Sequence, residues 1–287
     1  MTGQGMLDTK NGSELVAAAV TALFVPGDRP ERFAKAAASG ADVVIIDLED
    51  AVTADNKAKA LSSARESLAE GGVRALVRIN PTETDTQESE IAALLSLTTS
   101  GDHGLLGIML PKADNPRILA KLRERLPQEL ALVPLIESAA GLVQALELAK
   151  VPGTTRLAFG AIDYALDIDA SGEDRFLDHA RSQLVLASRA AGIAAPLDSP
   201  CIDIQDTDRI ADSARLAKKF GFGGKLCIHP RQLPAVAGAF VPTQAEVAWA
   251  SSVVGAEGAA VQVEGQMIDR PVTERAKRIL AQAGKDL

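Results

Sequence analysis

Two carboxylates follow apolar runs in a pattern that could hold a metal ion. Glu137 closes the run Leu132–Ile136, and Asp163 closes a second run that begins at Leu157. Short apolar runs that each end on an acid are typical of neighbouring buried strands whose carboxylates meet at one edge. Two carboxylates completed by substrate oxygens and water suit a hard divalent cation such as Mg²⁺. Either acid alone is also compatible with a helix N-cap or a loop, but the pair favours a metal site.

Arg78 lies inside the apolar run 77–79, where a buried guanidinium needs an anionic partner. It could clamp a substrate carboxylate or stabilise negative charge on a reacting oxygen, or it could bridge acids structurally. Glu49 and Asp50 end another run and could orient metal-bound water, although Asp50 would also suit an N-cap. Arg29 follows a Pro-Gly turn at a predicted helix start, where a substrate carboxylate or phosphate would be favoured. A solvated arginine is the alternative there.

Two further strand-end residues have competing interpretations. His229 could act as a general base or have a structural role. Lys112 could form a Schiff base, but that chemistry needs a desolvating pocket rather than a ring of acids. Asp198 is expected to join the same group of strand-end residues.

The elements that would position these residues alternate between short apolar runs and amphipathic stretches. Eight strands are predicted, at 22–25, 42–47, 76–79, 107–110, 132–136, 157–159, 194–197 and 226–228. Apolar residues recur at helical spacing in the stretches 29–39, 56–70, 115–126 and 139–149, which predicts helices there. Eight strand–helix rounds predict an α/β fold, a (β/α)₈ TIM barrel with its active site at the carboxyl ends of the strands. We expect a catalytic barrel over residues 1–240 and a C-terminal helical extension over 241–287, with helices at 242–250 and 272–283.

Composition narrows the functional classes. Of the 287 residues, 47% are hydrophobic but only 3% are aromatic, which favours aliphatic parallel strands covered by helices. The net charge of -8 argues against binding to nucleic acid or to membrane surfaces. Cys201 and Cys227 form no metal-binding spacing and are predicted to be free thiols. No apolar run approaches the roughly 20 residues of a membrane span, and residues 1–11 lack signal-peptide features, so a cytoplasmic location is expected.

Motifs along the chain resemble a known family. The matching segments are Leu23–Phe33 (LFVPGDRPERF), Val43–Val52 (VVIIDLEDAV), Val77–Asn80 (VRIN), Met109–Lys112 (MLPK), Leu135–Ser138 (LIES), Phe159–Asp163 (FGAID) and Cys227–Pro230 (CIHP). They closely resemble the citrate lyase β-subunit-like proteins of the HpcH/HpaI aldolase superfamily, which also contains malyl-CoA lyases. The resemblance implies a TIM barrel that uses Mg²⁺ to cleave, reversibly, a C–C bond in a 3-hydroxyacyl-CoA such as citryl-CoA or malyl-CoA.

The resemblance also implies roles for particular residues. Glu137 and Asp163 match the metal ligands, Glu49 and Asp50 match acids that reach the metal through water, and Arg78 matches an arginine that faces the oxyanion. Glu137 would also contact the chelated substrate, and Arg29 would meet its acidic end.

The segment Gly265–Pro271 resembles the C-terminal motif of the malyl-CoA-lyase-type members, in which Asp269 matches an aspartate that enters the neighbouring subunit's site. The resemblance therefore implies a homotrimer or hexamer. A 2-keto acid aldolase that does not use CoA, and a β subunit active only within a citrate lyase complex, remain alternatives, and the acyl chain is left open.

Overall fold

The computed structural model describes residues 11–69, 72–82, 84–99, 101–171, 174–255, 262–263 and 266–284. Residues 1–10, considered above for targeting signals, lie outside this part. The chain divides into two compact units, Met1–Val236 and Ala237–Leu287. No helix among the described residues is both long enough and apolar enough to cross a membrane.

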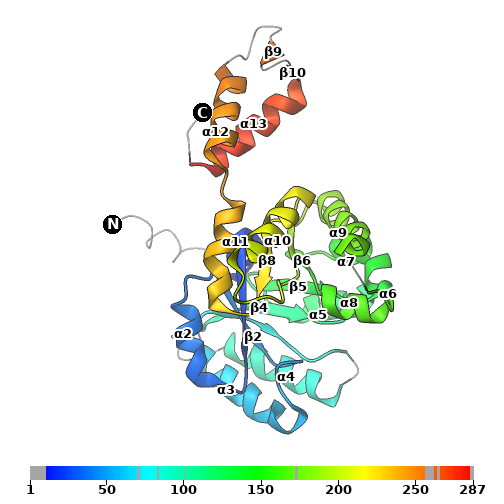
Figure 1. The fold of residues 1–287 in the computed structure, drawn as a ribbon. Coiled ribbons are helices and arrows are strands. Elements are labelled where there is room, and N and C mark those ends of the chain that lie inside the picture. Colours follow the sequence, from blue (N-terminus) through cyan, green and yellow to red (C-terminus); the bar gives the residue numbers. More distant parts are fainter. Residues whose placement is uncertain are drawn as a thin grey trace. The chain divides into compact units, whose positions relative to one another are not determined.

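Eight parallel strands of the first unit close into a barrel in chain order (Figure 1). Their bounds are β1 Thr21–Pro26, β2 Val43–Asp47, β3 Ala75–Arg78, β4 Leu105–Leu110, β5 Ala131–Ile136, β6 Arg156–Phe159, β7 Ala194–Asp198 and β8 Gly224–Cys227. The strands are nearly continuous apolar runs because both of their faces are buried, as in other parallel sheets. Pairing of Ala22 with Leu226 closes the ring. The predicted (β/α)₈ barrel is confirmed.

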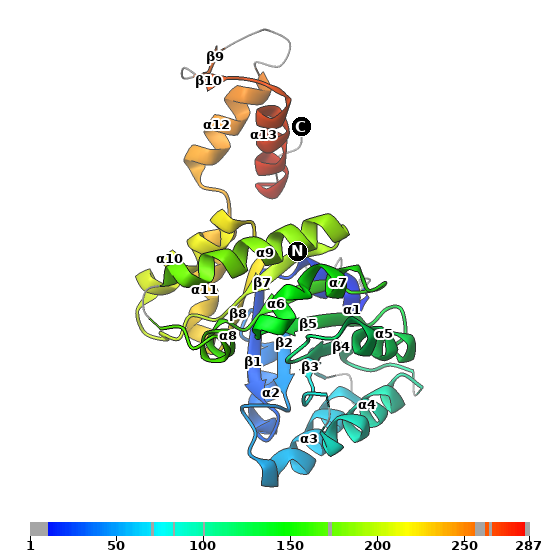
Figure 2. The same cartoon turned by 90° about the vertical axis from the view of Figure 1, so that its right-hand side faces the viewer.

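Helices surround these strands in both views (Figures 1 and 2). Their bounds are α1 Gly12–Ala18, α2 Phe33–Ala37, α3 Lys57–Ala69, α4 Asp85–Leu97, α5 Pro116–Arg125, α6 Ala139–Val143, α7 Ala145–Lys150, α8 Ala161–Asp167, α9 Asp178–Ala191, α10 Thr207–Phe220 and α11 Leu233–Phe240. Single 3₁₀ turns are η1 Pro30–Arg32, η2 Ala54–Asn56, η3 Asp174–Leu177 and η4 Pro230–Gln232. The helix predicted over 139–149 is interrupted at Gln144, whose ψ of 2° departs from helical geometry.

Side chains alternate between the barrel interior and the helical layer, and this alternation selects the residues at the mouth. Ile45, Leu76 and Leu135 belong to the interior apolar cluster, together with Val16 and Ala19 from the α1 region. Because side chains two residues apart in a strand share a face, Asp47, Arg78 and Glu137 continue the same inward-facing rows. They lie at the carboxyl ends of β2, β3 and β5.

The amino-terminal end of the barrel contains a buried arginine. Arg156, at the start of β6, is 1% exposed and donates hydrogen bonds to the carbonyls of Val16, Ala19 and Ala195. Burial lowers the pKa of Arg156 to about 9. This side chain connects β6 and β7 to the end of α1, so it has a structural role far along the strand from the mouth.

Asp198 does not face the mouth, so that prediction is wrong. Leu197 belongs to the interior cluster, and its neighbour Asp198 therefore points outward to the helical layer. There Asp198 pairs with Lys225 of β8 at 2.7 Å and with Arg181 of α9 at 3.5 Å. The three groups form a buried structural network.

The second unit contains the helices α12 Gln244–Gly255 and α13 Arg270–Gln282, and the short strands β9 Gln262–Val263 and β10 Gln266–Met267. The two helices pack through a small core formed by Ala250, Val253, Ala276 and Leu280. Arg275 of α13 lies over the Trp249 ring of α12 at 5.2 Å. The predicted helical character of this region agrees with the structure, and the division between the two compact units falls after Val236, within α11.

Candidate active site

A bidentate ion pair joins the ends of β2 and β3. Arg78 donates from Nε and Nη2 to the two carboxylate oxygens of Asp47, each over 2.7 Å. The register of the sheet places these residues opposite each other. Asp47 also accepts hydrogen bonds from the amides of Glu49 and Ala51. These four interactions orient Arg78 and the turn after β2. Asp47 therefore positions the site, a role that its place at the end of an apolar run does not reveal.

The remaining nitrogen of Arg78 faces the two predicted acids. Arg78 Nη1 lies 3.0 Å from Glu49 Oε2 and 3.3 Å from Asp50 Oδ2, and the guanidinium lies over the ring of Phe24 at 4.8 Å. Burial alone would lower the pKa of Arg78, but the hydrogen bonds and charge of Asp47, with the other acids, raise it above its usual value. Arg78 is therefore a permanent cation held among acids.

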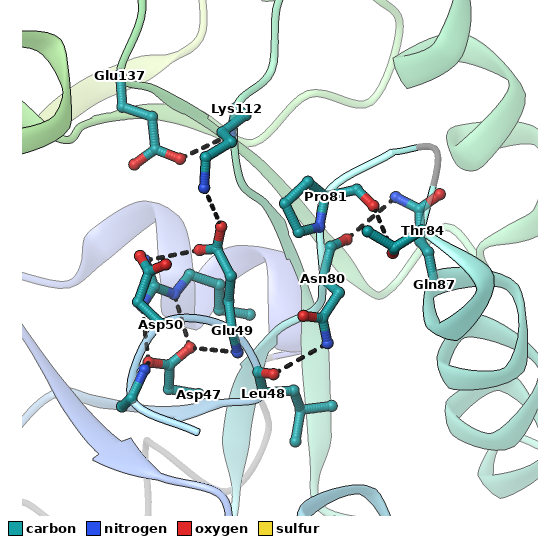
Figure 3. A network of polar contacts seen from close by, with 12 residues as sticks. Asp47, Leu48, Glu49, Asp50, Asn80, Pro81, Thr84, Gln87, Lys112 and Glu137 are labelled. Carbon is teal, nitrogen blue, oxygen red and sulfur yellow. Dashed lines mark hydrogen bonds and ion pairs between the residues drawn. The ribbon is translucent and has the colours of Figure 1, made fainter. Parts of the chain in front are cut away.

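Lys112 connects the β2 acids to the other side of the mouth (Figure 3). Its Nζ lies 2.5 Å from Glu49 Oε1. Burial raises the pKa of Glu49, and the neighbouring Arg78 and Lys112 oppose that rise. Burial would lower the pKa of Lys112, but its hydrogen bond to Glu49 and the charges of Glu49, Asp50 and Glu137 together raise it. A protonated, acid-paired ammonium is a poor nucleophile, so this environment disfavours the Schiff-base interpretation.

Glu137 lies at the end of β5 and is 3% exposed. Its Oε1 accepts a hydrogen bond from the Lys112 amide over 2.7 Å. A Cβ on Gly160 would lie 2.5 Å from Glu137 Oε2, so the glycine leaves the room that this carboxylate occupies. Burial, followed by the charge of Glu49, raises the pKa of Glu137 to about 8, and Asp163 adds to this effect.

Asp163 is placed differently from its predicted position. The β6 strand ends at Phe159, and Asp163 lies in the first turn of α8, where it is half-buried. The apolar run continues past the strand because Ala161 and Ile162 already belong to the helix. Asp163 still lies close enough for its charge to raise the pKa of Glu137, so the two predicted metal ligands are electrostatic neighbours.

A second layer of polar contacts holds the backbone behind Glu49. Lys57 Nζ donates to the carbonyls of Leu48 and Glu49 over 2.7 and 2.6 Å. Asn80 donates to the same Leu48 carbonyl over 2.9 Å (Figure 3). Asn80 is in turn bound through its amide and its side chain by Glu90 of α4. This layer fixes the direction in which the Glu49 side chain leaves the turn.

The other predicted residues lie outside this network. Arg29 precedes η1 and its side chain is 58% exposed, 3.9 Å from Asp28. His229 caps η4 by accepting a hydrogen bond from the Arg231 amide, which favours its structural interpretation. Asp269 belongs to the second unit, where its side chain caps α13 by accepting from the Val272 amide over 3.2 Å.

Within the described residues, no group of three or more His, Cys, Asp or Glu side chains is arranged to hold a metal ion. The donors at the mouth are instead a pair, Glu137 and Asp163, beside a third acid, Glu49, that is already paired with two cations. Glu137 is 3% exposed and makes no ion pair within 4.0 Å among the described residues, and its burial raises its pKa to about 8 despite the charge of Arg78. A cation held by two carboxylates and by non-protein oxygens fits this donor set.

Buried acids and a fixed arginine at the carboxyl end of a parallel barrel occupy the position of the active site in TIM-barrel enzymes. Residues 21–230 match the HpcH/HpaI aldolase/citrate lyase family. The chain belongs to this family.

Relatives with related activities match nearly the whole chain. A citrate lyase subunit beta-like protein of Mycobacterium tuberculosis is 38% identical, over 92% of this chain and 95% of its own length. An L-malyl-CoA/beta-methylmalyl-CoA lyase of Cereibacter sphaeroides is 32% identical, over 91% and 93% respectively. The crystal structure of CitE from Mycobacterium tuberculosis in complex with magnesium, acetoacetate and coenzyme A covers 94% of this chain and 99% of its own, with a TM-score of 0.82 and 37% identity.

Proposed function

We propose that this protein is a Mg²⁺-dependent lyase that cleaves a C–C bond in a 3-hydroxyacyl-CoA such as citryl-CoA or malyl-CoA. The products would be acetyl-CoA, or a homologue, and a 2-oxo acid. The observation that carries the proposal is the mouth itself, where Arg78 is fixed among acids near the buried Glu137, which has no ion-pair partner among the described residues. The names of the relatives support a CoA thioester as substrate, and a related structure contains both magnesium and coenzyme A.

Glu137 and Asp163 are the residues that would hold the cation. When bound there, Mg²⁺ would supply Lewis-acid polarisation of a chelated substrate oxygen. Gly160 provides the room beside Glu137 Oε2, and the Lys112 amide holds Oε1.

Arg78 would stabilise the negative charge that develops on the thioester oxygen when the C–C bond breaks. Its two bonds to Asp47 fix the guanidinium before the reaction, so that little reorganisation is needed. Glu49 and Asp50, which flank Arg78 Nη1, would orient water around the metal. The exposed Arg29 side chain would bind the acidic end of the substrate.

For the second unit we propose the role implied by the family motif. The segment 241–287 would pack on a neighbouring subunit of a homotrimer or hexamer and bring Asp269 to that subunit's site for proton transfer. The exposed position of Asp269 at the start of α13 is compatible with such a role. Mixing D269A chains with R78A chains tests it, because shared sites predict partial recovery of activity in mixed oligomers.

A complex-dependent role is the second candidate. A citrate lyase subunit beta of Leuconostoc mesenteroides subsp. cremoris is 31% identical over 91% of each chain. Under this alternative the purified chain would be inactive on free CoA thioesters.

The deciding experiment incubates the purified chain with Mg²⁺ and malyl-, methylmalyl- or citryl-CoA, and follows release of the 2-oxo acid. We expect turnover of at least one thioester, its loss in E137A, and little change in E147A, a matched control at an exposed glutamate paired with Lys150 on α7. No turnover of any thioester, together with unchanged Mg²⁺ affinity in E137A, would overturn the lyase proposal.

A further inference from the structure

Lys112 has a backbone conformation that non-glycine residues seldom adopt. Its φ is +48°, in the left-handed region that is unfavourable for residues with a Cβ. In this conformation its amide points at Glu137 Oε1 while its ammonium reaches Glu49 Oε1. A single residue after β4 thus contacts both carboxylates, one through the main chain and one through the side chain (Figure 3).

The two glutamates are left with different binding capacities. Both oxygens of Glu49 face cations: Oε1 lies 2.5 Å from Lys112 Nζ, and Oε2, which is buried and accepts no hydrogen bond, lies 3.0 Å from Arg78 Nη1. In Glu137 the Lys112 amide occupies Oε1, and within the described part of the chain neither oxygen is ion-paired with a cation. Gly160 lacks the Cβ that would press on Glu137 Oε2. Glu137 can therefore bind a cation directly, whereas Glu49 is already neutralised.

We propose that Lys112 is a positioning residue that keeps Glu49 out of direct contact with the metal and presents Glu137 Oε2 to it. The inference rests on the proposed Mg²⁺ site and goes beyond it by explaining why only one of two adjacent buried glutamates is a direct ligand. A ring of acids without this ammonium would bind the cation more tightly, through Glu49 as well. Lys112 thereby limits metal affinity and leaves coordination positions for substrate oxygens and water, which Mg²⁺ normally retains.

The test titrates MgCl₂ into the metal-free full-length chain by isothermal calorimetry, comparing the wild type with K112M. Methionine keeps an unbranched side chain but removes the ammonium. Freeing one carboxylate next to a divalent ion should tighten Mg²⁺ binding about fivefold, in proportion to the loss of a partly screened charge pair. A merely structural role for Lys112 would weaken binding instead.

Three further variants make the result specific. K112G removes the ammonium, keeps the amide and suits the left-handed backbone, so it should also tighten Mg²⁺ binding and serves if K112M does not fold. K112M/E49Q should return the affinity close to the wild-type value, because the freed carboxylate is removed as well. K150M is the matched control: Lys150 pairs with Glu147 at 2.9 Å, its side chain is 51% exposed against 49% for Lys112, and Mg²⁺ affinity should not change.

Equal or weaker Mg²⁺ binding by K112M and K112G overturns the inference, and so does a double variant that binds as tightly as K112M. These results are distinct from failure of the proposed function. If the wild-type chain binds no Mg²⁺, or if E137Q binds it as well as the wild type does, the metal site itself is wrong and the inference falls with it.

Discussion

Replacing Asp47 by asparagine should destabilise the barrel strongly, although the change is isosteric. Asp47 is 1% exposed, and its two oxygens accept four hydrogen bonds, two from Arg78 and two from the turn after β2. The asparagine Nδ2 would face donors where an acceptor is needed. The charge that balances a buried guanidinium would also be lost.

Removing one partner of a buried ion pair typically costs 3–5 kcal/mol, and we expect about 3 kcal/mol here, at the low end of that range. We choose the low end of the range because Glu49 and Asp50 still face Arg78 Nη1 in the variant and partly balance its charge. For a chain of this size about 3 kcal/mol corresponds to a fall in Tm of about 6 to 10 °C. The loosened Arg78 should also lower turnover of the thioester.

Thermal unfolding followed by far-ultraviolet circular dichroism measures this loss. Tryptophan fluorescence is unsuitable, because Trp249 lies in the second unit and not in the barrel. The matched control is D212N, because Asp212 also pairs with an arginine, Arg215, at 2.7 Å, but its side chain is 74% exposed. Exposed pairs of this kind contribute about 0.5 kcal/mol or less. Equal Tm losses in D47N and D212N would refute the argument that burial of the Asp47–Arg78 pair determines its contribution.

Two further outcomes follow from local packing. G160A should abolish or sharply weaken Mg²⁺ binding measured by calorimetry, because its Cβ would lie 2.5 Å from Glu137 Oε2. The control variant G238A, with nothing within 4 Å of the added Cβ, should bind Mg²⁺ normally. Normal Mg²⁺ binding by G160A would contradict the role of the glycine. In native protein at pH 8, a maleimide reagent should label the half-buried Cys201 far faster than Cys227, which is fully buried and whose pKa burial raises to about 12. Equal labelling rates, read by peptide mass spectrometry, would show that β8 opens readily.

Much of the fold and part of the site could be predicted from the sequence because they depend on local patterns. Each strand of the barrel is a short apolar run. The amphipathic stretches 56–70 and 115–126 become helices with little change in bounds, whereas 29–39 and 139–149 are each divided into two shorter elements. Residues that directly end inward-facing rows, such as Arg78 and Glu137, could be assigned to the mouth for the same reason. Glu49 and Asp50, in the turn after β2, do lie beside Arg78 as predicted.

The tertiary structure decided which polar side chains meet. The strand register places Asp47 opposite Arg78. The left-handed backbone of Lys112, which no local sequence pattern predicts, lets this residue contact both Glu49 and Glu137. Asp198 faces outward because a shift of one residue changes the face of a strand. Asp163 lies in the first turn of α8 because the last residues of the apolar run, Ala161 and Ile162, already belong to that helix. The sequence by itself therefore determined a barrel with acids at one end, whereas the pairing that leaves Glu137 open and Glu49 neutralised depends on contacts between strands distant in the chain.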